Sequence, residues 1–222
     1  MKTKFAVIMF LAIFAISGCT YIQGSKKADE LEIENKNLHD RIVQQKKENA
    51  KEIVHKDKEF SDLEKAKLEL ENALKKEIGD YKAKLELTER GLVVTFLSEV
   101  FFDSGKDIIR ENGKESIRKV AEVLNRDVPN SNVAIEGHTD NQLIKYSGWK
   151  TNWELSSARA LAVLHYFVDE CAVMPTRLSA NGYGEFRPVV ANDTEVNMQK
   201  NRRVEIVILP SKISKITKEA SN

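Results

Sequence analysis

The stretch VAIEGHTD, residues 133–140, decides the fold of the C-terminal half of this 222-residue chain. Residues 133–138 have the alternating pattern that is typical of a β-strand. The polar pair Thr139 and Asp140 follows directly. A polar segment follows, and apolar residues then recur at helical spacing from about Trp153 to Val168, with a plausible helix start at Asn152. We therefore predict a strand followed by a helix, with the polar pair between them.

The hydrophobic pattern on either side predicts the remaining elements. Residues 92–97 and 178–184 have strand-like sequences, and residues 201–209 alternate strongly. Residues 108–124 have helical spacing and end at a Pro-containing turn. The order is β-α-β-α-β-β, so we expect an α+β domain over residues 91–210. A mixed four-stranded sheet with two helices on one face would bury an adequate core for a domain of this size.

Composition excludes several classes of protein. The chain is 41% hydrophobic and 31% charged, with a formal net charge of +1. This balance argues against binding nucleic acid through bulk attraction to phosphates, so no nucleic-acid partner is expected. Two cysteines exclude a disulfide-rich scaffold, and ten glycines with four prolines exclude a collagen-like chain.

Residues 1–18 have the organisation of a secretory signal peptide. Two lysines precede an apolar run at residues 5–16, which is shorter than the roughly 20 residues that a membrane-spanning helix needs. The sequence ISGC at 16–19 resembles the bacterial lipoprotein box. That resemblance implies cleavage before Cys19 and lipid, including palmitate, on its thiol.

In such lipoproteins Thr20, following the cysteine, favours the outer membrane, with the protein on the periplasmic side of the bacterial envelope. Residues 19–25 would then be a lipidated linker. Two alternatives remain: an ordinary cleaved signal with an incidental cysteine, and an uncleaved anchor.

Residues 26–90 are rich in Glu, Lys, Leu and Ala, which favour a long helix of roughly 90 Å. Apolar residues recur at intervals close to a heptad: Leu31, Leu38, Ile42, Ile53, Phe60, Leu63, Leu70 and Leu74, followed by Ile78, Tyr81 and Leu85. We predict a coiled-coil helix that forms a homo-oligomer, because isolated polar helices are marginally stable. A single solvated helix is the alternative.

Four short motifs in the C-terminal block resemble those of the OmpA-like peptidoglycan-binding domain, a family that includes the Pal lipoprotein and the C-terminal part of MotB. They are GHTD at 137–140, NWELSSARA at 152–160, GYGE at 182–185 and NRRVE at 201–205. The resemblance covers about residues 91–209. It implies noncovalent binding of the peptide stem of peptidoglycan, mainly its diaminopimelate residue, and no cofactor. The loop at 141–150 is longer and more apolar than in Pal and closer to the MotB form.

The resemblance also implies roles for two charged residues. Asp140 matches the family carboxylate that takes the ammonium of diaminopimelate, and Arg159 matches the arginine that holds its carboxylate. A planar guanidinium suits that role because it donates two parallel hydrogen bonds. The alternative is a structural salt bridge between Asp140 and Arg159.

Six further residues match positions around the family pocket: Thr139, Asn152, Leu155, Ala158, Phe102 and Asp103. Leu155 and Ala158 could equally be core residues, and Asp103 could cap the next helix. Trp149 and Trp153 flank the 141–150 loop, where they either close over the ligand or fill the space between sheet and helix.

Arg202 and Arg203 begin the last strand. One of them could pair with Glu205 or Asp193 for structural reasons.

The sequence favours a non-enzymatic tether between membrane and wall. His138 and Asp140 lie on the same side of one strand, but neither a third metal ligand at suitable spacing nor a nucleophile motif accompanies them. We therefore expect no catalytic or metal-binding residues. The alternative is an envelope scaffold whose coiled coil binds another protein, with wall binding secondary and with Tol-like proteins as possible partners. The tail at 211–222 is polar and has no expected role.

Overall fold

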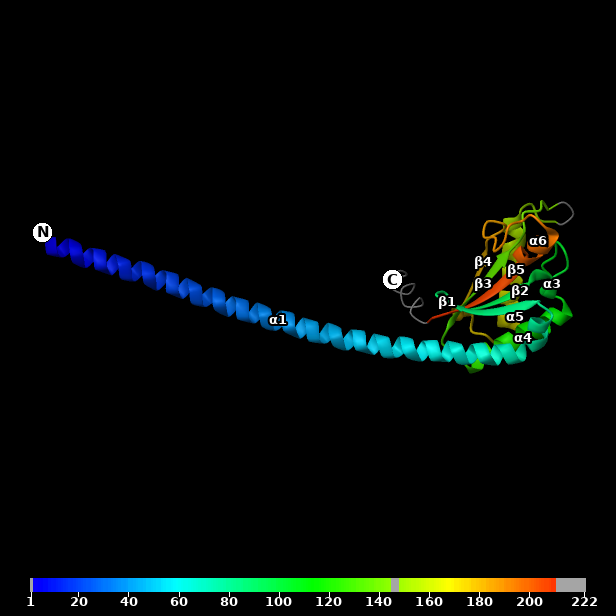
Figure 1. Ribbon diagram of the computed structural model, residues 1–222, viewed down its shortest axis with the longest axis horizontal. Coiled ribbons are helices and arrows are strands. Elements are labelled where there is room, and N and C mark those ends of the chain that lie inside the picture. Colours follow the sequence, from blue (N-terminus) through cyan, green and yellow to red (C-terminus); the bar gives the residue numbers. More distant parts are fainter. Residues whose placement is uncertain (1, 145–147, 211–222) are drawn as a thin grey trace. The chain divides into compact units, whose positions relative to one another are not determined.

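The computed structural model describes the backbone of residues 2–144 and 148–210 (Figure 1). Side chains are described from residue 31 onward within these ranges, except those of Glu52 and His55. The chain divides into two compact units, Met1–Lys56 and Asp57–Asn222. The expected polar tail at 211–222 lies outside the described residues.

A mixed five-stranded sheet forms the centre of the second unit (Figure 1). Its strands are β1 (Ala83–Thr88), β2 (Gly91–Leu97), β3 (Asn132–His138), β4 (Leu178–Gly182) and β5 (Arg203–Leu209). They lie in the order β1-β2-β5-β3-β4, and β3 and β4 pair in parallel while the other neighbours are antiparallel. The predicted α+β class and the four predicted strands are confirmed, with a fifth strand added at one edge.

Two long helices, α4 (Glu111–Arg126) and α5 (Asn152–Asp169), cover one face of this sheet, as predicted. Alternate residues of β2, β3 and β5 point toward these helices and are buried in a single core with them. Shorter helices are α2 (Lys75–Gly79), α3 (Ser98–Phe101) and α6 (Glu195–Asn201), and Pro175–Arg177 forms a 3-10 turn before β4.

The start of α5 is fixed by its own side chains. Thr151 Oγ1 accepts the backbone N–H of Glu154 at 3.2 Å, and Glu154 Oε2 accepts the N–H of Lys150 at 2.8 Å. The first bond satisfies an N–H group that the helix terminus leaves without an intrahelical partner, and the second fixes the residue before the N-cap. Asn152, Leu155 and Arg159 then follow at helical spacing on one side of α5.

The expectation of a helix up to residue 90 is wrong over its last part. The helix α1 (Lys2–Ala73) ends earlier, α2 follows, and residues 83–88 form the edge strand β1. Ala83, Leu85 and Leu87 alternate with polar residues, a period of two that predicts a strand when it is considered without the preceding helix. β1 pairs with β2 as a hairpin, in which Thr88 Oγ1 accepts the N–H of Arg90.

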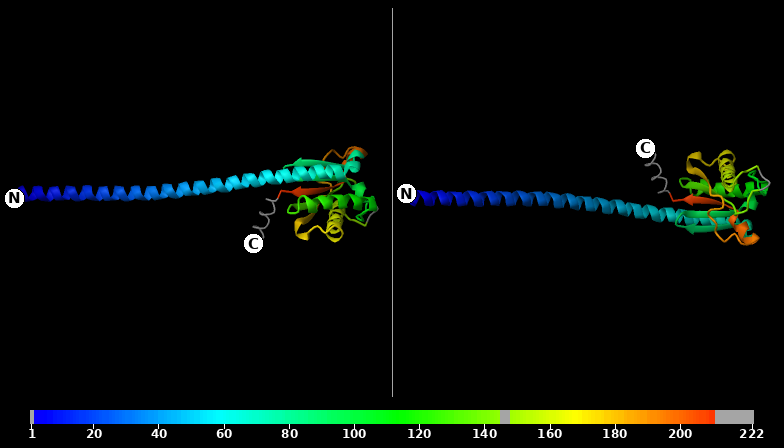
Figure 2. Two further views of the ribbon diagram at one scale, coloured as in Figure 1. Left: turned by 90° about the horizontal axis from the view of Figure 1, so that it is seen from below. Right: turned by 90° about the horizontal axis from the view of Figure 1, so that it is seen from above.

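Three of the residues assigned to the coiled coil belong instead to the core of the domain. Leu63, Leu70 and Leu74 are buried in the same cluster as the inner faces of α4 and α5. The last turns of α1 run beside α4, where Arg126 Nη2 lies 3.2 Å from Glu69 Oε2 (Figure 1 and Figure 2). The part of α1 from Asp57 onward is therefore a structural element of the second unit.

The first unit is the N-terminal part of α1. Leu31, Leu38, Ile42 and Ile53 are exposed on this helix. The expected signal peptide and Cys19 lie where only the backbone is described. Within the part of the chain that the structure describes, no helix is both long and apolar enough to cross a lipid bilayer.

Candidate functional site

A cavity of about 830 Å³ opens where several segments of the domain meet. Its walls come from α3, the loop after it, the segment that follows β3, the first turns of α5, and α6 with the residue after it. Seven of the eight residues predicted to contact ligand line it: Phe102, Asp103, Thr139, Asp140, Asn152, Leu155 and Arg159. The eighth, Ala158, is half-buried and is not among the lining residues, so its contact with ligand stays a prediction.

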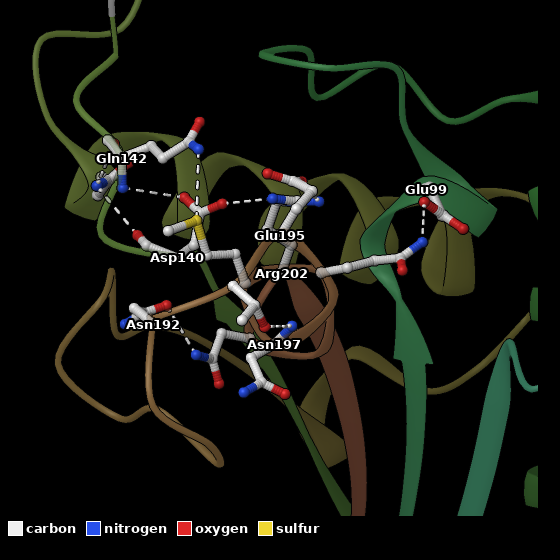
Figure 3. Close-up of polar contacts among 12 residues, drawn as sticks. Glu99, Asp140, Gln142, Asn192, Glu195, Asn197 and Arg202 are labelled. Atoms are coloured by element: carbon white, nitrogen blue, oxygen red, sulfur yellow. Dashed lines mark hydrogen bonds and ion pairs between the residues drawn. The ribbon is translucent and has the colours of Figure 1, made fainter.

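Asp140 is held by two partners at the end of β3 (Figure 3). Its Oδ2 lies 2.6 Å from Nη1 of Arg202, and its Oδ1 accepts the backbone N–H of Gln142 at 3.2 Å. Arg202 also contacts Glu195 Oε1 through Nη2 at 2.6 Å. Burial disfavours the Arg202 cation, but its hydrogen bonds to Asp140 and Glu195 outweigh that effect and raise the pKa of Arg202.

Arg159 is a buried cation that also lines the cavity. Its Nε donates to the carbonyl of Lys106 at 2.9 Å and its Nη2 to that of Asp103 at 3.2 Å. The guanidinium also lies 5.2 Å from the centroid of the Phe102 ring. Burial lowers the pKa of Arg159 to about 10, so the side chain stays charged at neutral pH. These contacts fix the guanidinium in place.

The structural alternatives for these residues are settled by this geometry. Asp140 pairs with Arg202, so the proposed structural salt bridge between Asp140 and Arg159 is wrong. Asp103 lies near Lys106 and Arg110, and α4 has no side-chain cap, so Asp103 does not cap that helix.

Arg203 is the second arginine of the NRRVE motif. Its Nε lies 2.6 Å from Oε1 of Glu205, which is the structural pairing that the sequence offered as an alternative. Sequence reasoning assigned Arg202 no place in the site, because its partner Asp140 is distant in the sequence.

Two buried hydroxyl groups in the cavity wall have no hydrogen-bond partner among the described residues. They are Ser98 Oγ and Thr139 Oγ1, and each residue is at least nine-tenths buried. A buried polar atom without a partner costs free energy comparable to a lost hydrogen bond. Both residues line the cavity, and each hydroxyl is closed to solvent as the side chains stand.

Two glycines allow α5 to approach the sheet closely enough to form this wall. A Cβ on Gly137 of β3 would lie 2.1 Å from the carbonyl oxygen of Ser156, and one on Gly182 of β4 would lie 2.5 Å from the backbone nitrogen of Ser157. Any larger residue would push the helix away. The glycines of GHTD and GYGE therefore position Asn152 and Arg159 indirectly.

The other face of the sheet carries a second buried polar cluster. Ligand atoms of Glu136, His138 and Glu205 lie within 4.8 Å of one another, a grouping that the sequence could not reveal because Glu205 comes from β5. Arg90 pairs with Glu136 and Arg203 with Glu205, so arginines neutralise both carboxylates. This arrangement fits a structural charge cluster.

His138 is the neutral member of this cluster. Burial, together with the nearby Arg203, Arg187 and Arg90, lowers its pKa to about 3.

Comparison with known proteins identifies the family of this chain. Residues 101–202 match the model of the OmpA family. Motility protein B of Bacillus subtilis is 38% identical over 151 residues, which cover 67% of this chain and 57% of that relative. The protein YtxE of the same organism is 32% identical over 213 residues, which cover 93% of this chain and 84% of the relative. Omp38 of Acinetobacter baumannii is 41% identical over 113 residues, covering 51% of this chain and 30% of Omp38. The chain therefore spans less than two thirds of Motility protein B and of Omp38.

Solved structures share the fold. A MotB-like protein from Desulfovibrio vulgaris superimposes with a TM-score of 0.63 at 25% identity, covering 71% of this chain and 99% of that one. The cell wall anchor of the T6SS from Pseudomonas aeruginosa gives a TM-score of 0.58 at 27% identity. The match covers 64% of this chain and 96% of that one. Together with the fold and the motifs around the cavity, these matches show that the chain belongs to the OmpA family.

Proposed function

We propose that this protein is a non-catalytic tether that binds the peptide stem of peptidoglycan and is held to a membrane by lipid on Cys19. The observation that carries the first part is a single cavity lined by an anion, Asp140, and a buried cation, Arg159. Diaminopimelate in the stem presents an ammonium and a carboxylate on one carbon. An anion and a cation facing one cavity are complementary to that pair of charges.

The pairing of Asp140 leaves room for a ligand. Oδ2 is taken by Arg202, while Oδ1 accepts one backbone N–H and has further acceptor capacity for an ammonium. Arg159 uses Nε and Nη2 for backbone carbonyls, and Nη1 has no bond to a described residue. That nitrogen is available to donate to the ligand's carboxylate.

Similarity to a cell wall anchor and to motility and outer membrane proteins supports a binding role over catalysis. We place the lipid in the outer membrane, with the domain in the periplasm, because Thr20 follows the lipidated cysteine.

Binding to purified sacculi tests the site assignment. The full-length protein should sediment with sacculi, and Asp140→Ala or Arg159→Ala should each reduce binding at least tenfold, because each removes a charged hydrogen bond of about 1.5–3 kcal/mol. Matched controls are Asp169→Ala and Arg118→Ala, which remove exposed charges outside the cavity. Unchanged sedimentation of both cavity variants would show that these residues are not the ligand-binding pair.

The exposed apolar residues of the first unit are compatible with self-association of the tether and with a second candidate, an envelope scaffold. Leu31, Leu38, Ile42 and Ile53 remain exposed at heptad-like intervals, which supports association with another helix. We infer that the partner helix is α1 of a second copy of this chain, which gives a homo-oligomer. A scaffold would instead use this surface to bind a Tol-like or other envelope protein.

Deletion of residues 26–56 distinguishes the two roles. A tether would lose self-association in sedimentation equilibrium and keep its affinity for sacculi. A scaffold would lose co-purification of its partner from detergent-solubilised envelopes.

A further inference from the structure

A stacked aromatic pair lies outside the cavity and takes no part in the core. The rings of Trp153, on α5, and Phe186 have centroids 5.1 Å apart and planes inclined by 22°. Trp153 is 48% exposed and Phe186 is 63% exposed, although each ring already covers one side of the other. Neither belongs to a hydrophobic cluster of the described residues. Large apolar side chains gathered on a surface mark an interaction site more often than isolated ones do.

This pair is connected to the cavity through one short hydrogen bond. Trp153 follows Asn152, which lines the cavity, and Phe186 follows Glu185. Nδ2 of Asn152 donates to Oε2 of Glu185 at 2.6 Å and to the carbonyl of Gln142 at 3.1 Å. Asn152 thus ties the segment that carries Phe186 to the wall of the cavity.

The backbone under the pair is held in place by Ser156. Its hydroxyl donates to the carbonyl of Trp153 at 3.1 Å and accepts the N–H of Gly184 at 2.9 Å. Gly184 has a φ of +54°, which turns the chain between β4 and Phe186. Because one side chain ties both segments together, the two rings are preorganised and lose little conformational entropy when a ligand binds.

A sugar ring fits this surface chemically. A pyranose has an apolar face of C–H groups and hydroxyls around its edge, so it can stack on an exposed aromatic ring while its hydroxyls remain hydrated. The stem peptide is covalently joined to a sugar polymer, and each peptide residue spans at most about 3.5 Å. A stem peptide seated in the cavity therefore keeps its glycan strand within reach of the neighbouring surface.

We propose that Trp153 and Phe186 form a platform for the glycan strand of peptidoglycan, next to the cavity that takes the stem peptide. This inference rests on the proposed function and adds a second subsite to it. The protein then recognises the junction between sugar and peptide rather than the peptide alone.

Calorimetric titration of the full-length protein with two ligands tests this platform. The ligands are a disaccharide tetrapeptide that contains diaminopimelate and the same tetrapeptide without sugar. The wild type should bind the disaccharide form about five- to tenfold more tightly. Trp153→Ala with Phe186→Ala should abolish that difference and leave the Kd of the free tetrapeptide unchanged. Trp153→Tyr should retain most of it, because an aromatic face remains.

The matched control is Leu161→Ala, which removes an exposed apolar side chain from the same helix. Equal affinity of the wild type for both ligands would overturn the platform while leaving the proposed function intact. Binding of neither ligand would overturn both. Binding of the disaccharide form without binding of the free tetrapeptide would support the platform and reject the cavity assignment. Loss of self-association in the double variant, with unchanged affinity for sugar, would identify the pair as a contact between copies instead.

Discussion

At the scale of single residues, the cavity is defined by charges that the fold separates. Asp140 and Arg159 were recognisable from their motifs, but their separate partners were not. Arg202 neutralises Asp140, and two backbone carbonyls hold Arg159. Each charge is therefore stabilised without an ion pair between the two residues. In the proposed function, Asp140 then faces the ammonium of the ligand and Arg159 faces its carboxylate.

His138 gives a testable pH dependence at the same scale. Its pKa is about 3 in the folded protein and about 6.5 when unfolded, so between these values the unfolded state binds a proton that the native state does not. Stability should therefore fall as the pH falls below about 6.5, by roughly 2 kcal/mol between pH 7 and pH 5 from this residue. Arg203, Arg187, Arg90, Glu136, Glu205 and Tyr183 surround it.

Urea unfolding at the two pH values measures this effect. His138→Gln should show a smaller loss of stability than the wild type, whereas His165→Gln, an exposed control on α5, should behave like the wild type. An NMR titration of the His138 imidazole provides an independent check. The same pH dependence in the wild type and His138→Gln, or protonation of native His138 near pH 6, would contradict the prediction.

At the scale of elements, the decisive finding is that the end of α1 and the strand β1 belong to the folded domain. Leu63 and Leu70 of α1 and Leu74 just after it are buried against the domain, and β1 covers the edge of β2. A fragment of residues 91–222 lacks both elements and would expose part of the core. The domain therefore begins near residue 57 rather than at residue 91.

Substitution within α1 measures that contribution. Leu70→Ala should destabilise the domain by about 2–5 kcal/mol, because it removes a fully buried side chain and leaves a cavity. Phe60→Ala, on the same helix but exposed, should cost less than about 1 kcal/mol. Urea unfolding followed by tryptophan fluorescence gives both values. Equal values for the two variants, or full stability of residues 91–222, would place α1 outside the domain.

At the scale of the whole molecule, the proposed tether requires a lipid at one end and wall binding at the other. Cys19→Ser should block incorporation of labelled palmitate and move the protein from the membrane fraction to the soluble fraction. Cys171→Ser is the control, because Cys171 is a half-buried thiol in the folded domain. Continued labelling of Cys19→Ser would show that the lipid lies elsewhere or that the signal is of the ordinary kind.

The sequence by itself determined the α+β class, the family motifs and seven of the residues that line the cavity. Alternating and helical hydrophobic periods, and short motifs such as GHTD, act over a few residues and are visible in the chain. The tertiary structure decided what depends on contacts between distant segments. The leucine repeat of α1 is equally compatible with a partner helix or with the protein's own core, because periodicity gives the apolar face and not its occupant. The roles of Arg202, Glu205 and Phe186 likewise emerged only when β5 and the loop after β4 were brought beside β3 and α5.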